Sequence, residues 1–484
     1  MLSGTATGRT VTIAGTGNTT ITGTIANGPS ATTGGLTINS SGTTTLSGSN
    51  SYSGNTTITS GTVILSGTNT GSGSVILSAS TSVANGNLSG ASSTGNTGLV
   101  DLTSGGNYSI NSLGNSSAIA GYLNFTNSSG LATTLTFTNA TNYITASSGN
   151  SGGRTISNNS TNLTINGAGT VTLASDNTYN GATTVSGGGV LVLLGSNTFN
   201  GLNISSGSVK IGKASSLGSG VISNTSSSGL IGIDTSAGTG NNWALGNNIV
   251  AGSTTNDFMA FSPGSGNSLT LNGVVSGAGW LKVSSGGDLY VNNVNNSYTG
   301  GTEVGTGRII ISDSRALGAG IINFGTTTNS YLVASSTMNI TNGITIGSGS
   351  TSGYTANLDT GSNDMSVTSI VADKAGNANG GKINKLGTGT LTLSGANTYS
   401  GGTTVNQGAL AISASNNLGT GGVTINSNAI LRAAASLTNN QNITVSTGNT
   451  GYVEAAAGTT NTLNGTLTKN GSVLVLGGGG THVV

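Results

Sequence analysis

The sequence predicts an all-β fold, a right-handed parallel β-helix with about 20 residues in each coil. Three features predict it: short alternating apolar strings, a regular distance between these strings, and glycine-rich separators that carry almost no charge. Strings such as 11–13 and 391–393 alternate apolar and polar residues, as strands with one buried face do. One such coil cannot bury its apolar face alone, so the repetition indicates coils that stack on one another.

An aromatic residue marks each copy of the repeat. A tyrosine stands two residues before a glycine, six before an isoleucine or valine, and nine before a second glycine. The residues that define the repeat are Tyr52, Gly54, Gly61, Tyr179, Gly181, Gly188, Tyr298, Gly300, Gly307, Tyr399, Gly401 and Gly408. A fifth, shortened copy runs from Ser196 through Phe199 to Gly207. Chance does not explain this agreement, so the copies are expected to adopt the same local structure.

The apolar strings recur after about 19 to 20 residues, a length typical of solenoid repeats. The pairs expected to stack on neighbouring coils are Leu391 with Leu410, Leu393 with Ile412, Leu289 with Ile309, Val291 with Ile311, and Leu46 with Leu65. Helical repeats are excluded because the strings are rich in Thr, Val and Ile and lack a helical period. Only two prolines occur, as expected where most backbone N–H groups bond to the next coil.

The domain organisation follows from the same repeat. Residues 1–484 are predicted to form one continuous β-helix without an internal linker. The strings are less regular near residues 81–160 and 230–268. We interpret these segments as degenerate coils with longer loops, because their composition matches that of the regular copies.

The composition excludes several classes of protein. The chain has 12 Lys+Arg and 11 Asp+Glu in 484 residues, with a net charge of +1, so nucleic acid and anionic membranes are not expected partners. No stretch is long and apolar enough to span a bilayer. A third of the residues are hydrophobic, which argues against disorder despite 85 glycines.

Two recurring polar positions leave alternatives open. Asn50, Asn177, Asn296 and Asn397 lie just before the aromatic residue, where asparagine either forms a turn locally or bonds between coils in a ladder. The tyrosines either pack on the flank of a turn or present their rings as platforms for sugars.

The segment from Gly387 to Val405, followed by Gly408, Ala409 and Leu410, closely resembles the passenger-associated transport repeat of autotransporters. Segments 42–65, 169–193 and 277–311 are similar to it. The resemblance implies a β-helical passenger that is exported and displayed on, or shed from, the cell surface. Autotransporters end in a membrane barrel of amphipathic strands, a pattern that residues 477–484 lack. Either the barrel is cut off, or the chain is a secreted relative that uses another anchor or assembles with itself, and both alternatives are left open.

The ionisable groups argue against an enzyme, although a β-helix can carry polysaccharide lyases and hydrolases. His482 is the one histidine and is the third residue from the end of the sequence, which argues against a Ser-His-Asp mechanism. The densest acidic group is Asp359, Asp364 and Asp373, whose spacings do not match one coil, so we interpret them as solvated loop charges. Asp288 and Asp313 with Arg308 or Arg315 form the alternative cluster across coils. The sequence therefore predicts no catalytic, cofactor-binding or metal-binding residue.

The expected function is that of a non-enzymatic structural or adhesive protein, extracellular or displayed on the outer membrane. Its expected partners are surface glycans or proteins of a host or neighbouring cell, or further copies of itself. A self-assembling fibre or sheath subunit is the first alternative, and a polysaccharide lyase or hydrolase the second.

Overall fold

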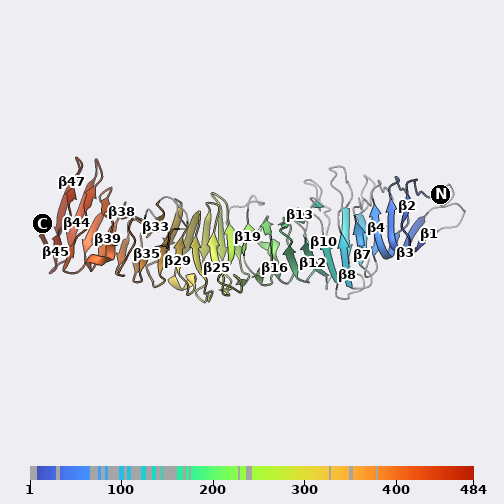
Figure 1. The fold of residues 1–484 in the computed structure, drawn as a ribbon, viewed down its shortest axis with the longest axis horizontal. Helices are drawn as coiled ribbons and strands as arrows, with labels where there is room; N and C mark the ends of the chain where they lie inside the picture. Colours follow the sequence, from blue (N-terminus) through green and yellow to red (C-terminus); the bar gives the residue numbers. More distant parts are fainter. Residues whose placement is uncertain are drawn as a thin grey trace. The chain divides into compact units, whose positions relative to one another are not determined.

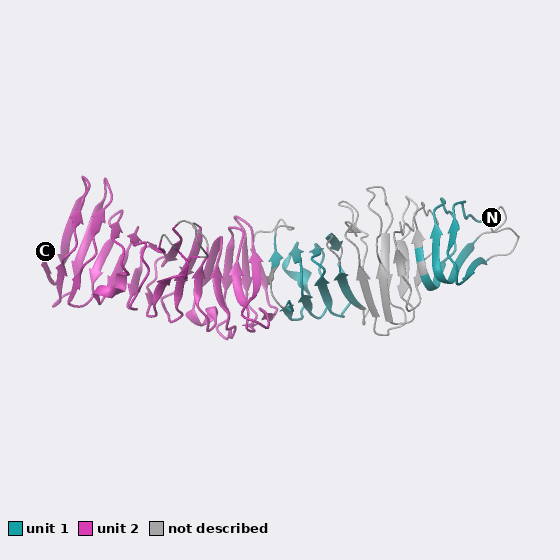
Figure 2. Ribbon diagram, viewed as in Figure 1, with its two compact units in different colours: residues 1–226, 231–240 teal, residues 227–230, 241–484 magenta. Residues whose placement is uncertain are grey.

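In the computed structural model the chain divides into two compact units (Figure 2). Unit 1 comprises residues 1–226 and 231–240, and unit 2 comprises residues 227–230 and 241–484. The structure describes residues 8–28, 33–65, 75–77, 82–84, 97–102, 106–110, 122–126, 133–137, 143–144, 161–166, 170–173, 176–226, 229–235, 242–325, 329–347, 353–377 and 380–484. Most of the predicted irregular segment 81–160 lies outside these residues. That residues 1–484 form one continuous β-helix stays a prediction.

Unit 1 consists of short parallel strands (Figure 1). Its strands are β1 (Arg9–Gly15), β2 (Thr19–Ile21), β3 (Gly34–Leu46), β4 (Thr56–Leu65), β5 (Val75–Leu77), β6 (Ser82–Ala84), β7 (Thr97–Leu102), β8 (Gly106–Ile110), β9 (Tyr122–Thr126), β10 (Thr133–Phe137), β11 (Tyr143–Ile144), β12 (Thr161–Asn166), β13 (Thr170–Leu173), β14 (Thr183–Ser186), β15 (Val190–Leu193), β16 (Leu202–Ile204), β17 (Ser208–Ile211), β18 (Ile222–Asn224) and, from residue 231 onward, β19 (Gly229–Asp234). One 3-10 turn, η1 (Ala214–Leu217), follows β17. Two stacks run side by side, one through β12, β14, β16 and β18 and one through β13, β15, β17 and β19.

Unit 2 repeats the same plan with more sheets. Its strands are β20 (Asn242–Leu245), β21 (Ile249–Val250), β22 (Asp257–Ser262), β23 (Ser268–Leu271), β24 (Val275–Ser276), β25 (Trp280–Val283), β26 (Asp288–Val291), β27 (Gly301–Val304), β28 (Gly307–Ile311), β29 (Ile322–Phe324), β30 (Ser330–Ala334), β31 (Met338–Ile340), β32 (Ile344–Ile346), β33 (Thr355–Asp359), β34 (Met365–Val367), β35 (Val371–Asp373), β36 (Lys382–Leu386), β37 (Thr390–Leu393), β38 (Thr403–Val405), β39 (Ala409–Ile412), β40 (Val423–Ile425), β41 (Ile430–Ala433), β42 (Leu437–Asn439), β43 (Ile443–Val445), β44 (Thr450–Ala455), β45 (Thr460–Leu463), β46 (Leu467–Thr468), β47 (Val473–Gly478) and β48 (Thr481–Val483), with 3-10 turns η2 (Ser314–Leu317) and η3 (Ser415–Leu418). The longest sheet runs from β20 through β23, β26, β28, β30, β33, β36, β38, β40 and β43 to β46, and a second runs from β31 through β34, β37, β39, β41 and β44 to β47.

The described strands pair in parallel, and their register confirms the predicted stacking. Leu391 pairs with Leu410 and Leu393 with Ile412, and Leu289 pairs with Ile309. Val291 pairs with Ile311 and Leu46 with Leu65, as predicted. The predicted all-β parallel β-helix is therefore confirmed.

The coils average about 22 residues, slightly more than the predicted length. The regular copies keep the shorter step, whereas Trp243, inside the segment predicted to be irregular, pairs with Leu269 after a longer step. Strands are equally short there, so the additional residues lie in the connections between strands. The described part of residues 230–268 thus has a longer step, and its interpretation as degenerate coils of one continuous domain stays a prediction.

The core of unit 2 is a set of apolar columns. Leu391, Leu410, Leu431 and Val453 follow one another in register on β37, β39, β41 and β44, and each is at most 1% exposed. Burying one such side chain contributes about 1.5–3 kcal/mol. The alternate positions on these strands face outward, and strand stacking thus produces the buried column that the alternation predicts.

Each 3-10 turn carries a second recurring element that the sequence analysis missed. Leu217, Leu317 and Leu418 end these turns and are at most 1% exposed. The glycines that follow them have φ values of 62°, 63° and 66°. A Leu-Gly dipeptide about 18 to 20 residues after the aromatic marker was the available signal.

Candidate functional site

The repeat tyrosines lie inside the coils. Tyr179, Tyr298 and Tyr399 are fully buried, and Tyr52 is 2% exposed. Each hydroxyl lies 2.5–2.7 Å from the hydroxyl of the threonine four residues later, for example Thr403. Their ring faces are therefore closed to a ligand, so the sugar-platform alternative is wrong for these four residues, and they act as core residues at a turn.

Burial raises the pKa of Tyr179, Tyr298 and Tyr399 above the ordinary value. The unfolded chain loses these protons near pH 10, whereas the folded chain keeps them, so the free energy of unfolding is expected to fall above about pH 10. An absorbance titration of tyrosinate should show a late step that coincides with loss of the far-ultraviolet circular dichroism. The variant Tyr399→Phe should shift that step to higher pH, and Tyr452→Phe, at a half-buried position, should not. Reversible ionisation of all tyrosines with the dichroism intact would contradict this prediction.

The asparagines before the aromatic residue bond between coils. Asn296 accepts a hydrogen bond from the Val275 N–H at 2.7 Å and donates to the Ala316 carbonyl at 2.8 Å. Asn397 does the same with the Val371 N–H at 2.7 Å and the Asn417 carbonyl at 2.6 Å. One amide thus links the coil before it to the coil after it.

The other two copies show parts of the same arrangement. Asn50 accepts from the Ile25 N–H at 2.9 Å, and Asn177 donates to the Asn197 side-chain oxygen at 2.7 Å. Of the two alternatives for this position, bonding between coils is therefore the one that the structure shows.

The repeat glycines lie where successive coils approach closely. A Cβ atom at Gly54, Gly300 or Gly401 would lie 2.5–2.8 Å from a backbone carbonyl oxygen of the preceding coil. At the second glycine of the repeat, Gly61 and Gly408 combine such a close approach with a positive φ. A Cβ atom at Gly307 would likewise lie 2.8 Å from the Gly287 carbonyl oxygen. At Gly181 the backbone carbonyl accepts from the Asn200 N–H at 3.2 Å. Side chains larger than hydrogen do not fit at most of these points.

Two of the acidic residues that the sequence singled out are bound by groups of the next coil. Asp364 accepts from the Thr390 N–H at 2.8 Å and Asp373 from the Ser400 hydroxyl at 2.6 Å, so these carboxylates cap turns of the next coil. Asp364 is exposed between strands, as the interpretation of a solvated loop charge expects, whereas Asp373 is half-buried at the end of β35. Both carboxylates nevertheless have partners on the next coil. The reason is that stacking brings backbone N–H groups of the following coil to loops that appear isolated in the sequence.

The alternative charged cluster separates into local pairs. Arg308 lies 3.6 Å from Asp288 on the preceding coil and 3.7 Å from Asp359, which is two coils further on. Arg315 instead pairs with Asp313 at 2.7 Å within one turn, and its hydrogen bonds lower the pKa of Asp313 to about 2. Within the described part of the chain, no three His, Cys, Asp or Glu residues lie close enough to hold a metal ion.

A buried lysine was not anticipated from the sequence. Lys385 is fully buried, and its ammonium donates to the carbonyls of Leu386 at 2.8 Å, Gly387 at 2.7 Å and Gln407 at 3.1 Å. It also donates to the Thr360 hydroxyl at 3.1 Å. The available signal was the alternation along β36. Lys385 stands two residues after the core residue Ile383, so it faces the same side of the strand.

Burial lowers the pKa of Lys385 to about 8, although Asp359 and Asp364 partly oppose this effect. The unfolded lysine has a pKa near 10.4. Between about pH 8 and pH 10.4 the side chain is therefore mostly neutral in the folded chain and mostly protonated in the unfolded chain. The free energy of unfolding is expected to rise from about pH 8 to 9.5, and Lys385→Met should abolish the rise. Urea unfolding at several pH values measures it, with Lys382→Met at an exposed position as control. An unchanged pH dependence in Lys385→Met would refute the prediction.

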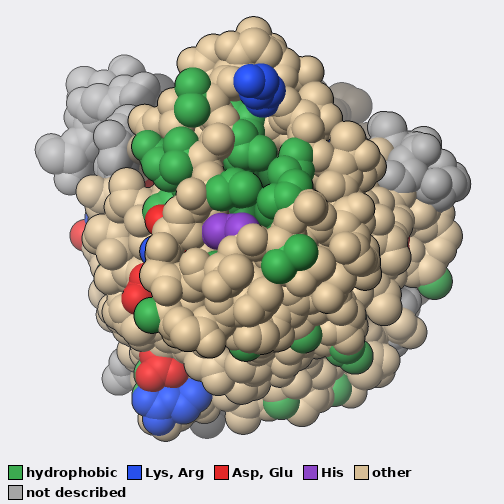
Figure 3. Space-filling view, turned by 90° about the vertical axis from the view of Figure 1, so that its left-hand side faces the viewer, with side chains coloured by type: hydrophobic (Ala, Val, Ile, Leu, Met, Phe, Trp, Pro, Cys, Tyr) green, Lys and Arg blue, Asp and Glu red, His purple; other side chains and the backbone are tan. Residues whose placement is uncertain are grey.

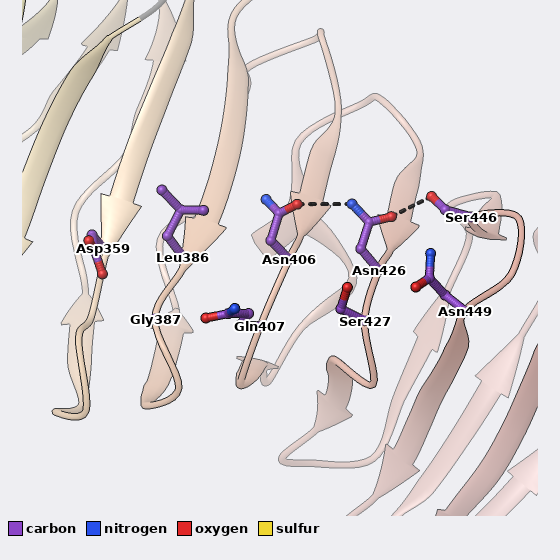
Figure 4. Close-up of a pocket in the computed structure, with 9 residues that line it drawn as sticks. All are labelled: Asp359, Leu386, Gly387, Asn406, Gln407, Asn426, Ser427, Ser446 and Asn449. Carbon is purple, nitrogen blue, oxygen red and sulfur yellow. Dashed lines mark hydrogen bonds between the residues drawn. The ribbon is translucent and has the colours of Figure 1, made fainter.

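An open groove of about 770 Å³ lies on unit 2 (Figure 4), and Lys385 bonds to the backbone of three residues that line it. The residues that line it are Asp359, Leu386, Gly387, Asn406, Gln407, Asn426, Ser427, Ser446 and Asn449. They come from successive coils of the sheet that contains β33, β36, β38, β40 and β43. The groove therefore crosses several strands rather than following one.

Another distinct surface lies on the last coil of the chain. Figure 3 shows hydrophobic side chains gathered around the single histidine on this face. Val473, Leu476 and Val483 are 55%, 40% and 48% exposed, and a ring nitrogen of His482 lies 2.9 Å from the Gly477 carbonyl oxygen. His482 thus contacts the backbone of this coil.

None of the helices in the described residues is long and apolar enough to cross a membrane. The parallel coils and the recurring tyrosine–glycine unit define a β-solenoid repeat protein. The family model of the passenger-associated-transport-repeat matches residues 40–65, 163–190, 186–211, 281–311 and 383–412. The chain carries this repeat at the five places where the sequence shows the copies, and the repeat together with the β-solenoid fits an autotransporter passenger. Such repeats suggest a secreted or surface protein.

No curated protein and no solved structure matches the chain.

Proposed function

We propose that this chain is a non-enzymatic structural and adhesive protein, extracellular or displayed at the outer membrane, that acts as a passenger of the autotransporter kind. The observation that carries the proposal is the layered construction of unit 2. Apolar columns fill the coils, asparagines such as Asn397 link successive layers, and the outer faces carry hydroxyls and amides. Such a surface has little net charge and offers many weak polar contacts, which suits a spacer that touches another surface.

The arrangement of the ionisable groups supports a role without catalysis. Asp288, Asp313 and Asp359 lie in ion pairs, and Asp364 and Asp373 cap backbone. A hydrolase requires two carboxylates that face one substrate across a cleft. The alternative of a polysaccharide lyase or hydrolase is tested by incubating the purified chain with a panel of polysaccharides. Turnover that Asp364→Asn or Asp288→Asn abolishes would overturn the proposal.

Adhesion itself is tested with beads that carry the purified chain through one end. We expect coated beads to be retained on cell or polysaccharide surfaces under flow more than beads coated with an unrelated protein. Retention should be insensitive to salt, because few of the contacts are ionic. Retention equal to that of the control protein on every surface would refute the adhesive part.

The fibre alternative stays a prediction, and concentration-dependent sedimentation distinguishes it from the adhesin. A sedimentation coefficient that increases steadily with concentration indicates self-assembly, whereas a constant value favours a protein that acts as single copies.

A further inference from the structure

The groove in Figure 4 has a regular floor. Asp359 on β33 and Leu386 on β36 are register partners. Asn406, Asn426 and Ser446 follow the last residues of β38, β40 and β43, which are themselves in register. The floor is therefore a row of side chains, one from each successive coil, separated by about 4.8 Å.

The amides of this row form a directional chain of hydrogen bonds. Asn426 donates to the Asn406 side-chain oxygen at 2.9 Å, and the Ser446 hydroxyl donates to the Asn426 side-chain oxygen. Asn406 donates in turn to Asn384, which donates to Asn357 at 2.8 Å. An amide nitrogen has two hydrogens and its oxygen two lone pairs, so this chain uses half of the capacity of each linking amide.

The remaining capacity is available to a ligand at the open side of the row. Figure 4 shows Gln407, Ser427 and Asn449 along one side of the floor, on the turns that follow the strands. Gln407 and Ser427 are exposed, and the Gln407 side chain makes no hydrogen bond with another described residue. Regularly spaced donors and acceptors thus line both the floor and one wall.

The charges around the groove indicate an uncharged ligand. Asp359 is the one charged residue in the lining, and it already pairs with Arg308 and accepts from the Gly361 N–H at 2.9 Å. The Lys385 ammonium is surrounded by oxygens from Leu386, Gly387 and Gln407. Neither charge is free to pair with an ionic ligand, whereas hydroxyl groups match the free amide capacity.

We propose that this groove binds a neutral, extended polysaccharide segment, a β-1,4-linked glucan, with its axis along the row from Leu386 to Ser446. The proposal rests on the adhesive function proposed above and names its ligand. Each sugar of such an extended chain advances by a distance close to the coil spacing. Successive sugars are turned over relative to one another, so equivalent hydroxyls face the row at every second coil. A coiled α-linked glucan does not keep hydroxyls in line, so it fits the row poorly.

Calorimetric titration of the whole chain with cellohexaose tests the proposal, with maltohexaose and a hexameric oligogalacturonate as comparisons. We expect a Kd of about 0.1 to 1 mM for cellohexaose, in keeping with several weak hydrogen bonds, and much weaker binding of cellobiose, which spans fewer coils. No detectable binding of cellohexaose at about 10 mM, or stronger binding of the charged oligomer, would overturn it.

Two variants locate the binding. Asn426→Asp removes the amide donor from the centre of the row, and we expect it to weaken cellohexaose binding about tenfold. Gln407→Ala leaves the row intact and should weaken binding about threefold to fivefold. Asn292→Asp is the matched control, since Asn292 also donates to an asparagine of the preceding coil, Asn272 at 3.1 Å, outside the groove. Circular dichroism of each variant confirms that it is folded.

The outcomes separate this inference from the function on which it rests. Retained binding in both Asn426→Asp and Gln407→Ala would show that cellohexaose binds elsewhere and would overturn the groove assignment. Bead adhesion without cellohexaose binding would leave the adhesive function standing and refute the glucan groove. Groove binding without any adhesion of beads would support the site and contradict the adhesive role.

Discussion

Replacing Gly408 by alanine is expected to destabilise unit 2 by about 3 kcal/mol. The backbone at Gly408 has φ +64°, and a Cβ atom there would lie 2.5 Å from the Gly389 carbonyl oxygen and 2.6 Å from that of Thr388. A left-handed conformation costs about 1–2 kcal/mol for an alanine, and forcing an atom into a packed layer adds about 1–3 kcal/mol. The Gly389 carbonyl accepts from the Ala409 N–H, so it cannot move away without losing a bond between coils.

The same repeat position in unit 1 provides the control. Gly188 has φ +79°, but a Cβ atom there would meet no heavy atom of the described residues within 4 Å. Gly188→Ala is therefore expected to destabilise its surroundings by only about 1 kcal/mol. Hydrogen exchange followed by mass spectrometry reports local stability around each site. Similar losses of protection in the two variants would show that backbone conformation, and not the approach of coils, decides the effect.

Replacing Asn397 by alanine is expected to lower the free energy of unfolding of unit 2 by about 2–5 kcal/mol. The substitution leaves the Val371 N–H and the Asn417 carbonyl without their amide partner, in a position that is 5% exposed. Each buried backbone group that loses its partner costs about 1–3 kcal/mol. The effect should reach coils on both sides of the substitution, because one amide links them.

Urea unfolding measured by circular dichroism tests this expectation. Asn292→Ala is the control, since its amide bonds to Asn272 at an exposed position, and it should change the free energy by less than about 0.5 kcal/mol. If Asn397→Ala behaves like Asn292→Ala, the asparagine acts as a turn former and the linking role is refuted.

Much of the fold could be predicted from the sequence because the repeat itself fixes the register. Once Tyr399 and its equivalents are aligned, the apolar strings on either side align too, and the pairing of Leu391 with Leu410 follows. Alternation then assigns each residue to the core or the surface. The prediction was less accurate where coils lengthen, since the sequence contains no marker for the residues that enter a loop.

The partners of the polar residues could not be predicted in the same way. Asp373 and Ser400 lie far apart in the sequence, and only the stacking of two coils of unequal length brings them within 2.6 Å. Lys385 was overlooked because a lysine in a strand is ordinarily taken to face water, although its parity indicated the core. The Leu-Gly turns were visible in the sequence, but they follow only three of the five copies of the repeat.

By itself the sequence determined the class of fold and the approximate number of residues in a coil. Alternating apolar strings at a steady distance bury their apolar faces by stacking as parallel strands on successive coils. Only the tertiary structure decided which polar groups serve the interior and which remain for a ligand. Asn397 and Asn426 are the same residue in similar strings, yet one is 5% exposed and links backbone layers, while the other lines an open groove. The difference comes from the position of each residue relative to the turns of neighbouring coils, which depends on loop lengths summed along the stack.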